Sequence, residues 1–338
     1  MKKEVYILAI ESSCDDTSAA VLKNKKVLSN VVSSQKVHES FGGVVPELAS
    51  RAHQKNIVSV VEMALLKSGI QKSELSAIAF TQGPGLLGSL LVGVSFAKSL
   101  AMALKIPIIA VNHMKAHILA HLIENPENNY PNFPFLCLTV SGGHTQLLKI
   151  DSPLEFTVLG QTIDDAAGEA FDKIAKTIGL PYPGGPVLDK LAKLGNENAF
   201  TFALPKTEGY NFSFSGLKTS VLYFLQKEMK KNSNFIEENK NDLCASVQKA
   251  ILDVLFKKLD VLVNETGIKQ IAIAGGVSAN SGLRKRLMDK KALGWDVFIP
   301  PFEFCTDNAG MIGIAAYYQF LENDFAELTV VANPRLKI

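Results

Sequence analysis

Three of the six histidines in this chain fall within the decapeptide NHMKAHILAH, at positions 113, 117 and 121. On a helix, side chains four residues apart lie one above the other, so His113 and His117 could bind one metal ion through their ring nitrogens. Two ligands do not make a site, and the same pair could lie on a solvated helix face. His121 lies a further turn along, ~6 Å in the axial direction, and we expect it beside the ligands or on the surface.

The spacing of these histidines disfavours one hydrolytic chemistry. A zinc protease of the HExxH type needs a glutamate directly after the first histidine, as general base. Here Met114 and Lys115 follow His113. A metalloprotease therefore stays an alternative, but it would lack an obvious general base to activate the hydrolytic water.

Two turns of small and polar residues indicate a second chemistry. ILAIESSCDDTSAAVL begins at residue 7 and LCLTVSGGHTQLLKI at residue 136, and each reads as strand, turn and strand. A parallel βαβ unit needs a crossover of a dozen residues or more, so both are predicted to be β-hairpins that open two similar halves. In the second turn, the backbone N–H groups of Ser141, Gly142 and Gly143 could hold anionic oxygens. A plain tight turn is the alternative.

A third glycine turn, IAIAGGVSAN at 271–280, joins a buried strand to a helix that begins near residues 278–281. A helix N-terminus after such a turn suits the phosphate, sugar or base of a nucleotide. The three turns together describe an actin-like fold with a nucleotide between two lobes. In such a fold Glu11 and Asp15, at the end of the first strand, are candidates to face a phosphate or its cation, whereas Asp16 is typical of an Asx turn.

The elements that position these residues are short apolar runs and longer segments of helical periodicity. Their mixture predicts an α/β protein. The strands are expected at 5–11, 18–22, 27–32, 77–81, 108–111, 135–140, 146–150, 271–274 and 297–299. The helices are expected at 46–69, 86–104, 114–124, 165–178, 217–231, 243–265, 279–290 and 308–321.

Bulk properties set wider limits on the class of protein. A chain of 338 residues is long enough for two domains, and its net charge of +2 neither requires nor excludes nucleic acid. The four cysteines form no CxxC pair, which indicates a reduced, cytoplasmic protein. The apolar stretch 86–111 contains Lys98, Lys105 and Pro107, so we expect a helix, a turn and a strand there and no membrane span.

Eight motifs in order between residues 10 and 312 closely resemble the universal tRNA threonylcarbamoyladenosine transferases, once called O-sialoglycoprotein endopeptidases. They are IESSCDDTSAAV, HMKAH, VSGGHTQL, DDAAGEAFDK, YPGGP, FSFSGLKT, AGGVSAN and CTDNAGMI, and SGGHT is similar to the bacterial branch. The resemblance implies a two-lobed actin/hexokinase-like ATPase fold (ASKHA) with mixed sheets and the active site in the interlobe cleft. We expect one lobe at 1–125 plus 308–338 and the other at 126–307.

The activity that the resemblance implies is transfer of the threonylcarbamoyl group from L-threonylcarbamoyladenylate to the exocyclic amine of the adenosine beside the anticodon. The acceptors would be tRNAs that read codons starting with A, and AMP would be released. The implied partners are tRNA, a metal-lacking paralogue and a P-loop ATPase. A net charge of only +2 predicts weak tRNA binding by this chain alone, which favours partner subunits. A small-molecule kinase of the same fold is an alternative.

The resemblance also implies the roles of particular residues. Asp307, which by itself would be read as a helix cap, completes the metal site with His113 and His117. That set suits iron or zinc, with Fe²⁺ preferred, and Mg²⁺ could accompany the nucleotide. Asp172 would bind the ribose hydroxyls. The other implied substrate or nucleotide contacts are Thr139, Val140, Ser141, Gly142, Gly143, Gly185, Asp189 and Asn280.

Two further features stay open at this point. His144 could help at the phosphate, or be simply the first residue of the second hairpin strand. Helix 46–69, with its IVSVVEMALL face, could dock the paralogue, although ordinary core packing is the preferred interpretation.

Overall fold

The structure is a computed structural model that describes residues 4–127 and 129–338. The chain forms two compact units: Met1–Pro131, Ser152–Phe156 and Pro300–Ile338 make the first, and Asn132–Asp151 and Thr157–Ile299 make the second. Relative to the expected division, segments 126–131, 152–156 and 300–307 join the first unit. For the last of these, the physical reason is that Phe304 packs into the first unit's core.

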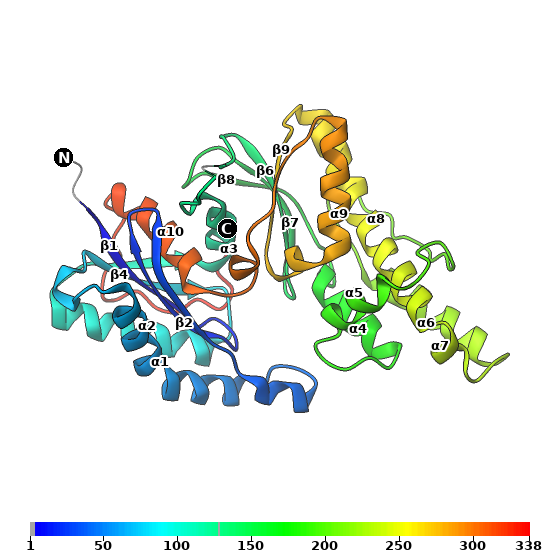
Figure 1. Cartoon of the computed structure of the whole chain (residues 1–338), viewed down its shortest axis with the longest axis horizontal. Coiled ribbons are helices and arrows are strands. Elements are labelled where there is room, and N and C mark those ends of the chain that lie inside the picture. Colours follow the sequence, from blue (N-terminus) through cyan, green and yellow to red (C-terminus); the bar gives the residue numbers. More distant parts are fainter. Residues whose placement is uncertain (1–3, 128) are drawn as a thin grey trace. The chain divides into compact units, whose positions relative to one another are not determined.

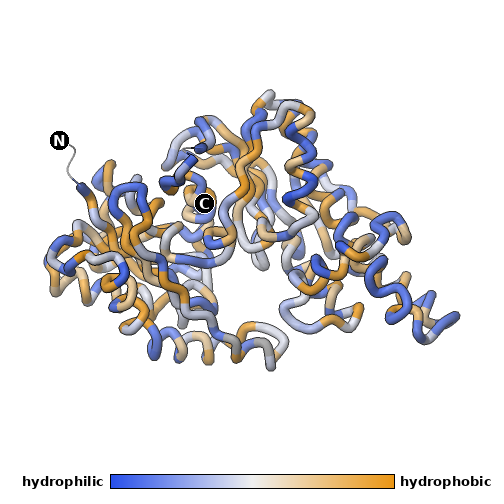
Figure 2. The backbone as a smooth tube through the Cα atoms, viewed as in Figure 1, coloured by the Kyte–Doolittle hydropathy of each residue, from blue (hydrophilic) through white to orange (hydrophobic). Residues whose placement is uncertain are grey.

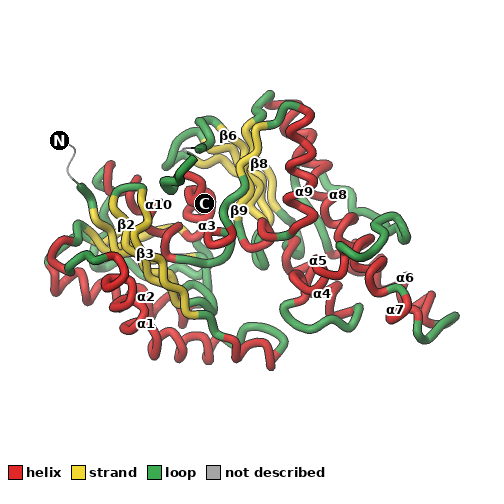
Figure 3. Tube along the Cα trace, viewed as in Figure 1, coloured by secondary structure: helices red, strands yellow, loops and turns green. Residues whose placement is uncertain are grey.

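Each unit is built on one five-stranded sheet (Figures 1 and 3). The first sheet has the order β3-β2-β1-β4-β5, and the second has the order β10-β9-β6-β7-β8. The strands of the first are β1 (Tyr6–Glu11), β2 (Thr17–Lys23), β3 (Lys26–Ser33), β4 (Ala77–Gly83) and β5 (Ile108–Asn112). Those of the second are β6 (Phe135–Val140), β7 (Thr145–Ile150), β8 (Phe156–Gln161), β9 (Gln270–Ala274) and β10 (Asp296–Phe298).

The two sheets repeat one topology. In each, the first two strands form an antiparallel hairpin, β1 with β2 and β6 with β7. The first strand then pairs in parallel with the fourth, β1 with β4 and β6 with β9. Both predicted hairpins are therefore confirmed, and the similar halves that they predicted extend to the whole strand order.

The first sheet is covered on both faces, and hydrophobic segments gather in its strands (Figure 2). This explains why β1 is apolar from Ile7 to Ile10, before Glu11 ends the strand. Leu8 and Ile10 pack with α1 (Pro46–Ser68) and α2 (Leu87–Leu104). Ile7 and Ala9, which point to the opposite face because successive strand side chains alternate, pack with α3 (His113–Leu119) and α10 (Ala309–Leu321). Helix α3, which carries His113 and His117, and the helix after Asp307 thus share one layer.

Helix α2 is long and apolar enough to cross a membrane by length and composition, with a third of that window buried. It packs against β4 and α1, as a helix of an α/β layer does. The chain then turns at Lys105, whose backbone is left-handed, and continues into β5. The predicted order of elements over residues 86–111, helix then turn then strand, is confirmed.

The second sheet packs with a larger set of helices. The single core cluster of this unit joins residues of β6, such as Leu136 and Leu138, to the helices around them. These helices are α4 (Ala167–Thr177), α5 (Gly184–Ala192), α6 (Ser215–Met229), α7 (Phe235–Glu238), α8 (Lys240–Thr266) and α9 (Ser281–Lys290).

Several elements differ from the sequence-based expectations, among them the following three. Strand β8 was not expected, because Val158 and Leu159 are its only adjacent apolar residues and half of the strand is exposed. Helix α5 was not expected, because it begins within YPGGP, where proline and glycine indicate a loop. Helix α3 ends at Leu119 instead of 124 and continues as a short 3₁₀ turn at Ala120–Leu122.

Candidate active site

The parallel strands of the first sheet bring three distant side chains together. Glu11 ends β1, Thr81 lies near the end of β4, and β5 ends at Asn112, directly before His113. Since β1, β4 and β5 are parallel neighbours, their carboxyl ends meet at one edge of the sheet. Thr81 and His113 both contact the carboxylate of Glu11 there.

Helix α3 presents the two predicted ligands on one buried face. The side chain of Asn112 caps the helix by accepting hydrogen bonds from the N–H groups of Met114 and Lys115. His113 and His117 are both buried. Their ring centroids lie 4.7 Å apart with an interplanar angle of 88°. The predicted sharing of one face by residues four apart is therefore observed.

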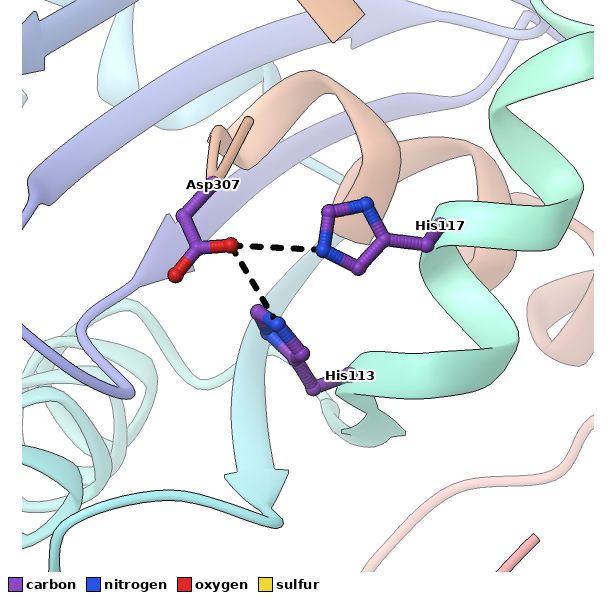
Figure 4. Close-up of side chains that lie close together, drawn as sticks. All are labelled: His113, His117 and Asp307. Atoms are coloured by element: carbon purple, nitrogen blue, oxygen red, sulfur yellow. Dashed lines mark hydrogen bonds and ion pairs between the residues drawn. The ribbon is translucent and has the colours of Figure 1, made fainter. Parts of the chain in front are cut away.

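Asp307 reaches this pair from the turn before α10 (Figure 4). The N-cap of α10 is Asn308, whose side chain accepts from the N–H of Met311, so the carboxylate of Asp307 is not used as the cap. Its Oδ1 lies 3.2 Å from Nε2 of His117 and 3.4 Å from Nε2 of His113. All three residues belong to the first unit, so the group is complete within that unit.

The donor set of this group fits a divalent metal. One atom each from His113, His117 and Asp307 lies within 4.8 Å of the other two. Metal–ligand bonds of ~2.0–2.2 Å place neighbouring donors roughly 3–3.5 Å apart, which matches the nitrogen–oxygen separations above. Two imidazoles and one carboxylate also leave open positions for substrate oxygens.

The charges at the site favour ionised carboxylates around one imidazolium. Burial opposes every charge here, but the charge of His113 and its hydrogen bonds hold the pKa values of Glu11 and Asp307 below their ordinary values. In turn Glu11 and Asp307 raise the pKa of His113 against its burial. Burial lowers the pKa of His117, which keeps it neutral, the form that binds metals. Metal binding would therefore displace a proton from His113.

The structure also places two other residues that the sequence singled out near the group. Glu11 was expected to face a phosphate or its cation, but it is completely buried, and its recorded partners are the protein donors Ser13, Thr81 and His113. His121, expected beside the ligands or on the surface, is buried in the 3₁₀ turn after α3 and lies outside the three-residue group.

The first hairpin turn lies beside this group and carries more acids. Asp15 and Asp16 are both half-buried. Burial, together with the charges of Asp15, Asp307 and Glu11, raises the pKa of Asp16 to about 6, against a hydrogen bond with Ser34 that lowers it. Asp16 therefore changes its charge near pH 6.

The pKa of Asp16 predicts a pH dependence of stability. The folded protein binds this proton more tightly than the unfolded chain, whose aspartates titrate near 4, so the Asp16 contribution falls as pH rises from about 4 to about 6 and is constant above. Asp16→Asn should remove this slope, a difference of roughly 2 kcal/mol for a two-unit shift after allowance for solvent. Urea unfolding of metal-free protein at pH 4.5 and pH 7 measures it. If the free energy of unfolding changed equally with pH in the wild type and in Asp16→Asn, the prediction would be contradicted.

The second unit contains a separate pocket of ≈ 290 Å³. Asp172 of α4 lies in its wall, and its Oδ1 accepts the N–H of Gly185 at 2.9 Å. Burial raises the pKa of Asp172, opposed by the amides of Gly185 and Gly184. Of the nucleotide contacts that the resemblance implies, this pocket brings together Gly142, Asp172, Gly185, Asp189 and Asn280. The sequence reasoning missed its apolar wall, which is formed by Phe171, Pro183, Pro186 and Val277.

Two polar residues of the pocket already support its wall. Asp189 accepts from the side chain and the N–H of Ser281 at 2.7 and 3.1 Å. Asn280 caps α9 through the N–H of Leu283 and donates to Gln248. Their side chains therefore hold the start of α9 against α5 and α8, and contact with a ligand would be additional.

The second hairpin turn differs in part from its expected role. The N–H of Ser141 donates to the carbonyl of His144 at 2.8 Å, so it is not available to an anion. Gly142 and Gly143 are exposed, and their N–H groups have no protein acceptor within the described residues. Thr139 and Val140 are completely buried, backbone included, so neither is open to a ligand. His144 is half-buried and ends the turn.

Comparison with known proteins identifies the family. A family model described as tRNA N6-adenosine threonylcarbamoyltransferase matches residues 26–314. Proteins with that name from Christiangramia forsetii and Cytophaga hutchinsonii are both 60% identical to this chain. The first alignment covers 99% of each chain, and the second covers 99% of this chain and 97% of the relative.

Solved structures show the same fold at low sequence identity. Full-length HypF, in a phosphate- and nucleotide-bound form, aligns with a TM-score of 0.63 at 16% identity, over 95% of this chain and 47% of HypF. Component A of the (R)-2-hydroxyglutaryl-CoA dehydratase of Acidaminococcus fermentans aligns with a TM-score of 0.54 at 16% identity, over 95% of this chain and 99% of that one. The α/β fold class expected from the sequence is confirmed.

Proposed function

This chain belongs to the tRNA N6-adenosine threonylcarbamoyltransferase family and is an acyltransferase that modifies tRNA, and we propose how its residues divide that work. The donor is L-threonylcarbamoyladenylate, and the acceptor is the exocyclic amine of the adenosine next to the anticodon, in tRNAs that read codons starting with A. A bond forms between that nitrogen and the carbamoyl carbon, the bond from this carbon to the phosphate oxygen breaks, and AMP leaves with the electron pair.

The observation that carries this proposal is the convergence of His113, His117 and Asp307 within 4.8 Å. These three residues would hold one divalent metal, with Fe²⁺ preferred to Zn²⁺ because two imidazoles and a carboxylate with open positions are typical of non-haem iron. A bound metal supplies Lewis-acid polarisation of the carbonyl or neutralises the phosphate. The amine is a poor nucleophile, so activation of this kind is what the reaction needs.

The pocket of the second unit would bind the adenylate half of the donor. Asp172 offers acceptors to the ribose hydroxyls, and the exposed N–H groups of Gly142 and Gly143 would stabilise negative charge on the departing phosphate. Mg²⁺ could accompany the nucleotide there. His144 would lie near the phosphate. The departing phosphate takes the proton that the amine loses.

The environment of Glu11, a carboxylate beside the histidine pair, favours a transferase over a metalloprotease. Glu11 lies 3.0 Å from Nδ1 of His113 but is completely buried and accepts from three protein donors. It is therefore poorly suited to activate a water for hydrolysis, and Met114 occupies the position where such a base would stand.

Partner subunits complete the proposal. We place a metal-lacking paralogue on α1, whose IVSVVEMALL segment buries five of its apolar side chains and exposes Val58, Met63 and Leu66. A groove lined from α1 and α2, with Ile57 and Leu91 among its residues, is a second surface of the same helix. A P-loop ATPase would be the third subunit, and the complex would act in the cytoplasm, where tRNA is found.

One assay tests the reaction and separates it from the alternatives. Purified protein, its metal and the partner subunits are incubated with L-threonylcarbamoyladenylate and unmodified tRNA, and the nucleosides are then analysed. We expect N6-threonylcarbamoyladenosine and stoichiometric AMP. Phosphorylation of a small molecule without metal binding through His113 would support a kinase instead, and peptide cleavage would support the protease.

A further inference from the structure

Glu11 has the most completely enclosed carboxylate beside the metal group. Its exposed fraction is 0%. Oε1 accepts the N–H of Ser13 at 2.5 Å, and Oε2 accepts the hydroxyl of Thr81 at 2.5 Å. The same Oε2 lies 3.0 Å from Nδ1 of His113. An ionised carboxylate only accepts hydrogen bonds, so Nδ1 of His113 must carry a proton to make this contact.

We propose that Glu11 is a positioning residue that fixes the tautomer of His113 and thereby sets the affinity of the site for its metal. This inference rests on the proposed metal role of His113, His117 and Asp307. With the proton held on Nδ1, Nε2, which lies 3.4 Å from Asp307, is the nitrogen that gives up its proton and offers its lone pair when a metal binds. Partners of this kind orient a ligating histidine and make it more basic, and their loss typically weakens metal binding by roughly 10–100-fold.

His113 has a competing arrangement that Glu11 excludes. The hydroxyl of Ser13 lies 3.3 Å from the same Nδ1, and a hydroxyl can donate as well as accept. Without a carboxylate, Ser13 could donate to Nδ1 and leave the proton on Nε2, where it would block the metal. The two histidines differ in this respect. Nδ1 of His113 contacts Glu11, whereas the buried Nδ1 of His117 has no partner within the described residues.

A glutamine at position 11 cannot reproduce these contacts, although it has the same shape. Its oxygen can accept at only one of the two positions, and its NH₂ group must face the other. If the NH₂ faces Ser13, two donors meet. If it faces Thr81 and His113, it donates to Nδ1 and shifts the imidazole proton to Nε2. The first arrangement keeps the proton on Nδ1 but destabilises the site through the clash of two donors, and the second opposes the tautomer that binds metal.

The test measures Zn²⁺ affinity by competition with a chromophoric chelator, using wild-type protein and Glu11→Gln. We expect the affinity to fall by about 10–100-fold. Asp164→Asn is the matched control, because Asp164 also accepts from several donors, around the start of α6 in the second unit, and its replacement should leave Zn²⁺ affinity unchanged.

A second measurement needs no variant and covers the case in which Glu11→Gln fails to fold. The ¹⁵N NMR spectrum of zinc-loaded wild-type protein should show His113 protonated at Nδ1 and bound through Nε2. Zinc bound through Nδ1, or equal affinities of the wild type and Glu11→Gln, would overturn the role of Glu11 alone. Failure of the wild type to bind metal would overturn the proposed metal site as well.

Discussion

His117→Ala is expected to remove the bound metal and to lower threonylcarbamoyl transfer about 1,000-fold. The substitution deletes one of the three direct ligands. Loss of a residue that only hydrogen-bonds to a ligand weakens metal binding by up to roughly 100-fold, and loss of a ligand should weaken it more. Lewis-acid assistance is worth several kcal/mol, and each 1.36 kcal/mol is tenfold in rate. Metal content after dialysis and single-turnover transfer measure the two effects.

The matched control for His117→Ala is His121→Ala. Both residues are buried histidines of one continuous helical segment, so both substitutions open a similar cavity. Only His117 belongs to the group with Asp307. His121→Ala should therefore keep its metal and most of its activity. Equal loss of metal from the two variants would indicate a general effect of packing and contradict the assignment of His117.

Gly275→Ala is expected to destabilise the second unit by roughly 2–4 kcal/mol, since a left-handed backbone costs a non-glycine residue about 1–2 kcal/mol and the clash adds to it. Gly275 has φ +88°, and a Cβ there would lie 2.6 Å from the carbonyl oxygen of Val140. Backbone must then move where the β6 and β9 turns meet. Trp295, the chain's one tryptophan, lies in this unit's core and reports the unfolding by its fluorescence.

Substitution of the neighbouring Gly276 should affect ligand binding without affecting the stability of the fold. A Cβ at Gly276 would meet no atom within 4 Å, yet Gly276 lines the ≈ 290 Å³ pocket. Gly276→Ala should change the free energy of unfolding by less than about 0.5 kcal/mol and weaken binding of the adenylate by filling part of the pocket. A Gly275→Ala protein as stable as the wild type would show that the turn is not constrained as described.

The sequence predicted the frame of this protein well because its strands are apolar and short. Both faces of β1 are buried, so its side chains form the continuous apolar run from which the strand was predicted. The two hairpins were predicted because the turns between their strands are too short for a parallel crossover. Strand β8 and helix α5 were missed for the opposite reason. The first is an exposed edge, and the second begins with the residues that usually end a helix.

The local geometry of the site was only partly accessible. Spacing alone placed His113 and His117 on one face, but the reach of Asp307 depends on Asn308 taking the role of cap, which the sequence left open. The position of Glu11 beside His113 depends on β1, β4 and β5 being parallel neighbours. Likewise, nothing in SGGHT indicates that the N–H of Ser141 is used within its own turn.

The most direct test of the account is the position of the metal itself. Anomalous diffraction from crystals grown with the purified metal-loaded protein should show one ion per chain, within ~2.0–2.3 Å of Nε2 of His113, Nε2 of His117 and a carboxylate oxygen of Asp307. An ion held elsewhere in the chain, or one that contacts the histidines while Asp307 points away, would contradict the account.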